Sequence, residues 1–160
     1  MSIGRLAGVF YLGTFVTGMV ALAAGANMSV ANGLATACYV GVTVLFYFLF
    51  KPVDATLSAI AAAFSAIGCT LSALAVFHLR PVPISELAFF GCYCITIGWL
   101  IVKSTMMPSA LGVALAIGGV SWLTFAVPPV AHALRPFNYA PGIFAEGALT
   151  IWLLAKGARA

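Results

Sequence analysis

Ionisable side chains are rare in this sequence, and those able to do chemistry lie near the ends of long apolar runs. The 160 residues contain seven Lys and Arg, three Asp and Glu, and two His. Both histidines, both glutamates and two arginines form one candidate ligand-binding set: His78, Arg80, Glu86, His132, Arg135 and Glu146. These residue types could transfer protons or bind an anionic group.

Glu146 lies about a turn and a half inside the last apolar run. An ionised carboxylate that is unpaired in hydrocarbon costs several kcal/mol, so we expect this side chain to face the protein interior. It could accept a proton or anchor a ligand, or it could pair with Arg80 or Arg135 while complementing a positive helix N-terminus. Glu86 begins its own run, and there the compensation of a helix dipole is the simpler interpretation.

The two histidines could together bind a metal ion or haem, because imidazole is a common ligand. Neither histidine has a second histidine four residues away, and an interfacial histidine bonded to a backbone carbonyl is the simpler interpretation. The sequence contains no phosphate-binding glycine loop, no His-Glu-x-x-His zinc motif and no Gly-x-Ser-x-Gly turn. We therefore predict no cofactor, with metal or haem at His78 and His132 as the alternative.

The composition identifies the solvent that this chain requires. Hydrophobic residues make up 64% of the sequence and charged residues 6%, whereas a soluble domain is roughly a quarter charged. So few charges cannot coat a globular surface, and a bilayer must cover the rest. The basic residues are dispersed singly, which provides no patch for nucleic acid.

Charged and turn-forming residues divide the chain into six runs, each near the length of about 20 residues that a membrane span needs. Asp54 and Ser85 are suitable N-caps, and Pro108 and Pro141 suit first helical turns. The sequence predicts a single all-α membrane domain over 1–160, with short loops and antiparallel neighbours. The expected helices cover 4–25, 31–50, 55–78, 86–103, 109–128 and 140–156.

Basic residues predict the orientation of this bundle. With the N-terminus in the cytoplasm, five basic residues lie on the inner side and only Arg80 and Arg135 on the outer side. The positive-inside rule then places both termini in the cytoplasm. The first run resembles a secretory signal, but it is long for a signal core, and we expect it to remain as the first helix.

Two further patterns predict how helices pack and end. Small residues four apart allow helix backbones to approach closely in lipid, and they occur at Gly4 and Gly8, at Gly33, Ala37 and Gly41, and at Ala114 and Gly118. Pro128 and Pro129 remove backbone donors late in the fifth helix. We interpret them as a helix stop at the interface, with a kink that opens a small polar pocket as the alternative.

The chain also resembles a family of small bacterial membrane proteins known as domain of unknown function 4386. The similar stretches are Gly91-Cys92-Tyr93, Ile97 to Ile101, Lys103-Ser104, Pro108 and Leu111-Gly112, with Arg5 to Gly8 and Tyr11-Leu12 at the start and Pro141-Gly142, Glu146, Trp152 to Leu154 and Gly157 near the end. The resemblance implies a multi-pass protein of the bacterial inner membrane. It implies no activity and no catalytic residues.

These observations favour a non-enzymatic membrane module that binds a lipid, a small amphiphile or a partner helix through an outer polar rim, the six candidate residues named above. The alternative is a membrane-embedded enzyme acting on an amphiphile at that face, with His132 or Glu146 as general acid or base. A secondary transporter is less favoured, because the middle of the chain offers only neutral polar groups. The expected partners are membrane lipid and a membrane protein or second copy, and not nucleic acid.

Overall fold

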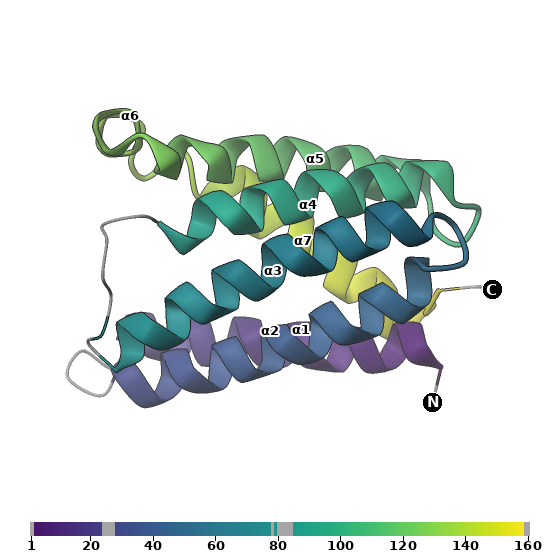
Figure 1. Cartoon of the computed structure of the whole chain (residues 1–160), viewed down its shortest axis with the longest axis horizontal. Helices are drawn as coiled ribbons and strands as arrows, with labels where there is room; N and C mark the ends of the chain where they lie inside the picture. Colours follow the sequence, from purple (N-terminus) through teal and green to yellow (C-terminus); the bar gives the residue numbers. More distant parts are fainter. Residues whose placement is uncertain (1, 24–27, 78, 80–84, 159–160) are drawn as a thin grey trace.

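The computed structural model describes residues 2–23, 28–77, 79 and 85–158, and every regular element among them is a helix. This confirms the predicted all-α membrane bundle. The elements shown in Figure 1 are α1 (Ile3–Ala23), α2 (Met28–Phe50), α3 (Ala55–Val76), α4 (Glu86–Lys103), α5 (Ser109–Leu123), the 3-10 helix η2 (Thr124–Ala126), α6 (Pro128–Ala133) and α7 (Ala140–Ala155).

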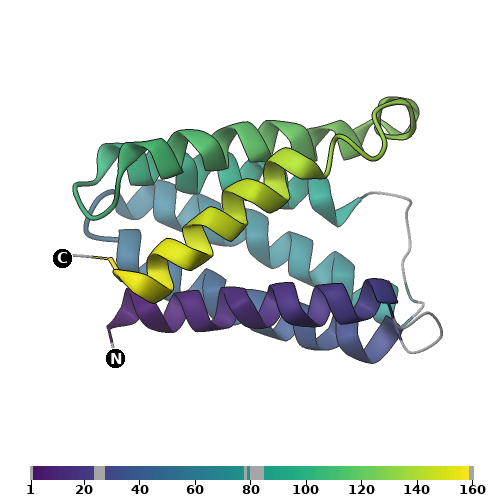
Figure 2. The same ribbon diagram turned by 180° about the vertical axis from the view of Figure 1, so that it is seen from behind.

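Length and hydropathy separate the six long helices into two groups. The segments 3–21, 29–50, 55–76, 86–103 and 109–126 are each long and apolar enough to cross a membrane. Helix α7 is also apolar but has only 16 residues, about 24 Å at 1.5 Å per residue. It crosses the bundle obliquely, in front of the other helices in Figure 2, and packs against both α1 and α5.

The six long helices close into a ring. Consecutive helices pack together from α1 to α5, and α7 packs on α5 and on α1, which completes the circuit. The connections 51–54 and 104–108 are short, so the helices they join run antiparallel (Figure 1). The ring has an interior that is lined by all six helices and a lipid-facing exterior, where large apolar side chains such as Val30 and Ile151 are exposed.

The caps that hold the helix starts match the sequence prediction. The Asp54 carboxylate accepts a hydrogen bond from the Leu57 amide at 3.0 Å and forms an ion pair with Lys103 at 2.9 Å. The Leu57 amide and the Lys103 ammonium together hold the pKa of the Asp54 carboxyl below its ordinary value of 3.8. Ser85 caps α4 through the Leu87 amide. The Asp54 contacts therefore fasten the start of α3 to the end of α4.

The fifth helix ends earlier than we expected. Helix α5 stops at Leu123, a 3-10 turn follows, and Pro128 begins the short helix α6, which we had not predicted. Val127 is extended, as a residue before proline prefers, because the proline ring disfavours helical geometry there. Proline suits a first helical turn, where no amide donor is required, so Pro128 starts a helix as well as ending one.

Both chain ends lie at the same end of the bundle. The Arg5 guanidinium donates a hydrogen bond to the Ala155 carbonyl, at 3.3 Å, which ties the start of α1 to the end of α7. The connection from α2 to α3, which begins at Lys51, and the end of α4, at Lys103, lie at this end as well (Figure 1). The described basic residues that we assigned to the inner side thus lie at one end of the bundle.

Glycine contacts set the spacing of α4 and α5. A Cβ atom added at Gly98 or Gly112 would collide with the carbonyl oxygen of the other glycine. Gly91 and Gly119, each seven residues from one of these, form a second such pair. Close backbone approach through small residues is the expected packing mode in lipid, where the hydrophobic effect does not drive helices together.

The predicted small-residue stripes are only partly correct. Gly4 and Gly8 lie against Ala158 and Leu153, which confirms that α1 approaches α7 closely. The expected stripe on α2 is wrong at Gly33, where an added Cβ would meet none of the described residues within 4 Å, although Gly41 does lie against the ring of Phe10. Periodicity marks a smooth helix face, but it does not say whether a neighbouring helix or lipid covers that face.

We predict that Gly98→Ala lowers the melting temperature of the protein in detergent. The added methyl group would overlap the backbone of α5, and overpacking of this kind typically costs about 1 to 3 kcal/mol. Gly33→Ala is the matched control, because its methyl group would enter open space and alanine favours a helix by about 0.5 to 1 kcal/mol. A Gly98→Ala protein as stable as the control would contradict the close approach of α4 and α5.

Candidate functional site

Glu146 is enclosed by the bundle, as the sequence analysis expected. The residue is only 8% exposed to solvent. The oxygen Oε1 accepts a hydrogen bond from Nε1 of Trp122, on α5, at 3.0 Å, and a weak one from Sγ of Cys94, on α4, at 3.8 Å. Gly142 lies against the Trp122 indole, where any side chain would collide with the ring. The glycine thereby makes room for the donor.

Three buried tyrosines, from α1, α2 and α4, converge on the same region. Tyr11 on α1, Tyr39 on α2 and Tyr93 on α4 are 0%, 6% and 1% exposed. The ring of Tyr39 lies edge-on to the other two rings, with centroids 5.7 Å away in both cases. All three hydroxyl groups are buried, and none makes a hydrogen bond of standard geometry within the described part of the chain. We call the set formed by Tyr11, Tyr39, Tyr93, Cys94, Trp122 and Glu146 the interior cluster.

Most of the interior cluster lies at the middle of the bundle and not at its rim, although Trp122 belongs to the last turn of α5. Cys94, which contacts Glu146, is near the midpoint of α4, and Tyr39 is the central residue of α2. We had placed Glu146 near the outer rim because it follows the start of its helix closely. That inference assumed that all the helices begin at one level, whereas α7 is short and oblique.

The structure therefore separates Glu146 from the other described candidates. Arg135 is exposed and donates a hydrogen bond to the Tyr139 hydroxyl at 3.0 Å, with its guanidinium 5.7 Å from the centre of that ring. No ion pair joins Glu146 to Arg135, although both are described, so this predicted pairing is wrong. The other predicted partner, Arg80, and the candidate His78 lie outside the described residues.

The remaining rim candidates lie at two separate helix ends. His132 is exposed on the last turn of α6, and Glu86 is half-buried in the first turn of α4, where it complements the positive end of the helix. Among the residues that the structure describes, no three His, Cys, Asp or Glu side chains are grouped to hold a metal ion. The cofactor expectation remains a prediction, since one of its two histidines is not described.

The break after α5 is filled by a buried residue that the sequence analysis overlooked. Asn138 is 4% exposed, and its side-chain amide donates to the Thr124 hydroxyl and to the Ala131 carbonyl. The Ser121 hydroxyl donates to the Asn138 carbonyl at 2.6 Å. The proline break is thus closed by the connection to α7, and these hydrogen bonds take the place of the polar pocket that we had considered as an alternative.

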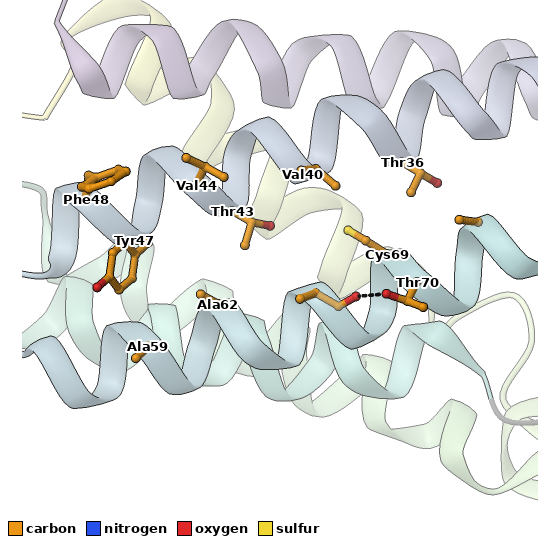
Figure 3. A pocket seen from close by; sticks show the side chains of 12 residues that line it. Thr36, Val40, Thr43, Val44, Tyr47, Phe48, Ala59, Ala62, Cys69 and Thr70 are labelled. Atoms are coloured by element: carbon orange, nitrogen blue, oxygen red, sulfur yellow. Dashed lines mark hydrogen bonds between the residues drawn. The ribbon is translucent and has the colours of Figure 1, made fainter.

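A second feature lies on the outside of the ring, between α2 and α3. A groove with a volume of about 730 Å³ is lined by twelve residues of these two helices (Figure 3). Alanines, including Ala59, Ala62 and Ala66, form much of the α3 wall, and threonine, valine and aromatic side chains form the α2 wall. The groove is hollow because the small side chains of α3 do not fill the space between the helices. We call it the α2–α3 groove.

The region that matches a known family includes four of the six residues of the interior cluster. Residues 83–157 match the family described as domain of unknown function (DUF4386). The match covers the part of the chain from just before α4 to just after α7. No match was found among curated proteins or among solved structures. The DUF4386 region supplies α4 to α7, with Tyr93, Cys94, Trp122 and Glu146, whereas the α2–α3 groove lies outside it.

Proposed function

We propose that this integral membrane protein is a non-enzymatic module that binds a lipid or lipid-like amphiphile, whose apolar chain lies in the α2–α3 groove. The observation that carries the proposal is the hollow of about 730 Å³ on a membrane-facing surface. A hollow in the bilayer is not left empty, because its lining would lose dispersion contacts. An acyl chain is the most abundant molecule able to fill it.

The chemistry of the groove supports an apolar occupant. Its three threonine hydroxyls already donate to carbonyl groups one turn earlier in their own helices, at 2.9 Å for Thr36 and 2.8 Å for Thr43 and Thr70. Figure 3 shows one of these bonds, between Thr70 and the backbone of α3. These hydroxyls therefore offer little to a polar guest, and small and apolar side chains form most of the remaining surface.

A basic residue at one end of the groove supports an amphiphile with an anionic headgroup. Tyr47 lines the groove, and the Lys51 ammonium lies 5.7 Å from the centre of its ring. Lys51 is exposed just beyond the end of α2 and has no acidic partner among the described residues. A lysine at the end of a span attracts anionic lipid headgroups, which gives the proposal both an apolar and a polar part.

We also propose the outer polar rim as a second binding site for an anionic group. His132 and Arg135 are both exposed on the connection between α5 and α7. A catalytic role for Glu146 is less well supported than lipid binding, because the ring of helices and the Trp122 indole enclose its carboxyl group. A partner helix or a second copy of the chain could also occupy the α2–α3 groove, and the experiment below separates these occupants from lipid.

We predict that native mass spectrometry of the protein in mild detergent detects bound phosphatidylglycerol after this lipid is added. Ala62→Phe fills the groove and should weaken binding about tenfold, which corresponds to about 1.4 kcal/mol. Ala63→Phe is the matched control, because Ala63 neighbours Ala62 but does not line the groove. Lys51→Gln should reduce the preference for phosphatidylglycerol over phosphatidylcholine.

Equal lipid binding by the Ala62→Phe and Ala63→Phe proteins would contradict the proposal. A dimer that Ala62→Phe converts to a monomer, without bound lipid in either form, would assign the groove to a second copy of the chain. Loss of the headgroup preference on Arg135→Gln, and not on Lys51→Gln, would place the anionic group at the outer rim.

We further propose that the protein lies in the bacterial inner membrane with both termini in the cytoplasm. Arg5, Lys51, Lys103 and Lys156 at one end of the bundle support this orientation. A reporter that is active only in the periplasm should fail when fused after Ala160 and work when inserted at Pro83. The opposite pattern would reverse the orientation.

A further inference from the structure

The interior cluster presents a charge problem that the described residues do not solve. Glu146 is buried at the middle of the bundle, and no lysine, arginine or histidine forms an ion pair with it among the residues described. The titratable groups that interact with its carboxyl group are Tyr11, Tyr39, Tyr93 and Cys94, all neutral in their ordinary state. An ionised carboxylate in this position needs a positive partner from elsewhere.

Several polar atoms of the interior cluster also lack a direct hydrogen bond to the described residues. Trp122 and Cys94 both donate to Oε1 of Glu146, and among the described residues no hydrogen bond of standard geometry reaches Oε2. Tyr11 and Tyr39 lie near enough to interact with the carboxyl group, yet neither hydroxyl makes a hydrogen bond of standard geometry with it. Buried polar groups that make no direct hydrogen bond with one another can share a small bound species.

The oxygen atoms of the interior cluster indicate which kind of small species could bind there. One carboxylate balances one positive charge, and the three phenol oxygens add neutral oxygen ligands. A divalent cation such as Ca²⁺ takes six to eight oxygens, usually from several carboxylates, and this cluster has only one carboxylate. The tyrosine rings pack against one another with centroids 5.7 Å apart, and this packing favours a small cation over a bulky organic one.

We propose that Glu146 and the hydroxyl groups of Tyr11, Tyr39 and Tyr93 form a buried binding site for a small monovalent cation, an alkali ion or ammonium. The carboxylate supplies the charge, and the phenol oxygens replace part of the hydration shell of the ion. Trp122 holds the carboxylate in place through its hydrogen bond to Oε1. The site lies inside the ring, whereas the α2–α3 groove lies outside it, so this inference is independent of the proposed lipid binding.

The experiment measures thermal unfolding of the full chain in detergent at constant ionic strength. Lithium, sodium, potassium or ammonium chloride is titrated against N-methyl-D-glucamine chloride, whose cation is too large for the site. Binding to the folded state alone raises the melting temperature with the logarithm of ligand concentration above the dissociation constant. We expect at least one of the four small cations to produce this rise, and Glu146→Gln to abolish it.

Tyr39→Phe and Tyr93→Phe test the site if Glu146→Gln fails to fold, because both substitutions keep the packed rings. Without a small cation each variant should be at least as stable as the original protein, since it removes a buried hydroxyl that has no partner. With the cation, the half-saturating concentration should rise about tenfold. Asp54→Asn, which removes a carboxylate at the end of the bundle, should keep the full response to the cation.

Three results would overturn the proposal. In the first, none of the four cations differs from N-methyl-D-glucamine, so that the carboxyl group is neutralised by a proton alone. In the second, the rise in melting temperature persists in folded Glu146→Gln. In the third, the two Tyr→Phe variants respond to the cation with an unchanged half-saturating concentration.

Discussion

A carboxyl group in the hydrocarbon region of a membrane must be enclosed and hydrogen-bonded, and the architecture of this protein satisfies that constraint. Six helices close into a ring, and the interior receives Glu146 from α7 and its indole donor, Trp122, from α5. Helices α1, α2 and α4 contribute the buried tyrosines. Because each helix packs on two neighbours, the carboxyl group is separated from lipid without being covered by a soluble domain.

Close packing by glycine makes this enclosure possible. Paired glycines let the backbones of α4 and α5 touch, and Gly142 leaves the space into which the Trp122 indole fits. Where α3 presents alanines to α2 instead, the backbones do not close together and the α2–α3 groove results. Small residues thus have opposite consequences in the two places: they allow direct contact between α4 and α5, and they leave a hollow between α2 and α3.

Much of the fold could be predicted from the sequence, because apolar runs and caps are local features. Asp54 and Ser85 cap the predicted helices, and the observed bounds differ from the expected ones by a few residues. The depth of Glu146 could not be predicted by counting residues along its helix, since depth depends on where the oblique α7 crosses its neighbours. Tyrosines near the centres of apolar runs were an available sign of a polar interior, but their convergence depends on which helix faces meet.

The most direct test of this account is a pair of double-mutant cycles on the unfolding free energy in detergent. Glu146→Met removes the acceptor at similar volume, and Trp122→Phe removes the indole donor. If the carboxyl group is held inside the bundle by Trp122, these two substitutions should show a coupling of about 1 kcal/mol, whereas Glu146→Met and Arg135→Gln should be additive. Additivity in the first cycle together with coupling in the second would instead place Glu146 at the rim and contradict the account.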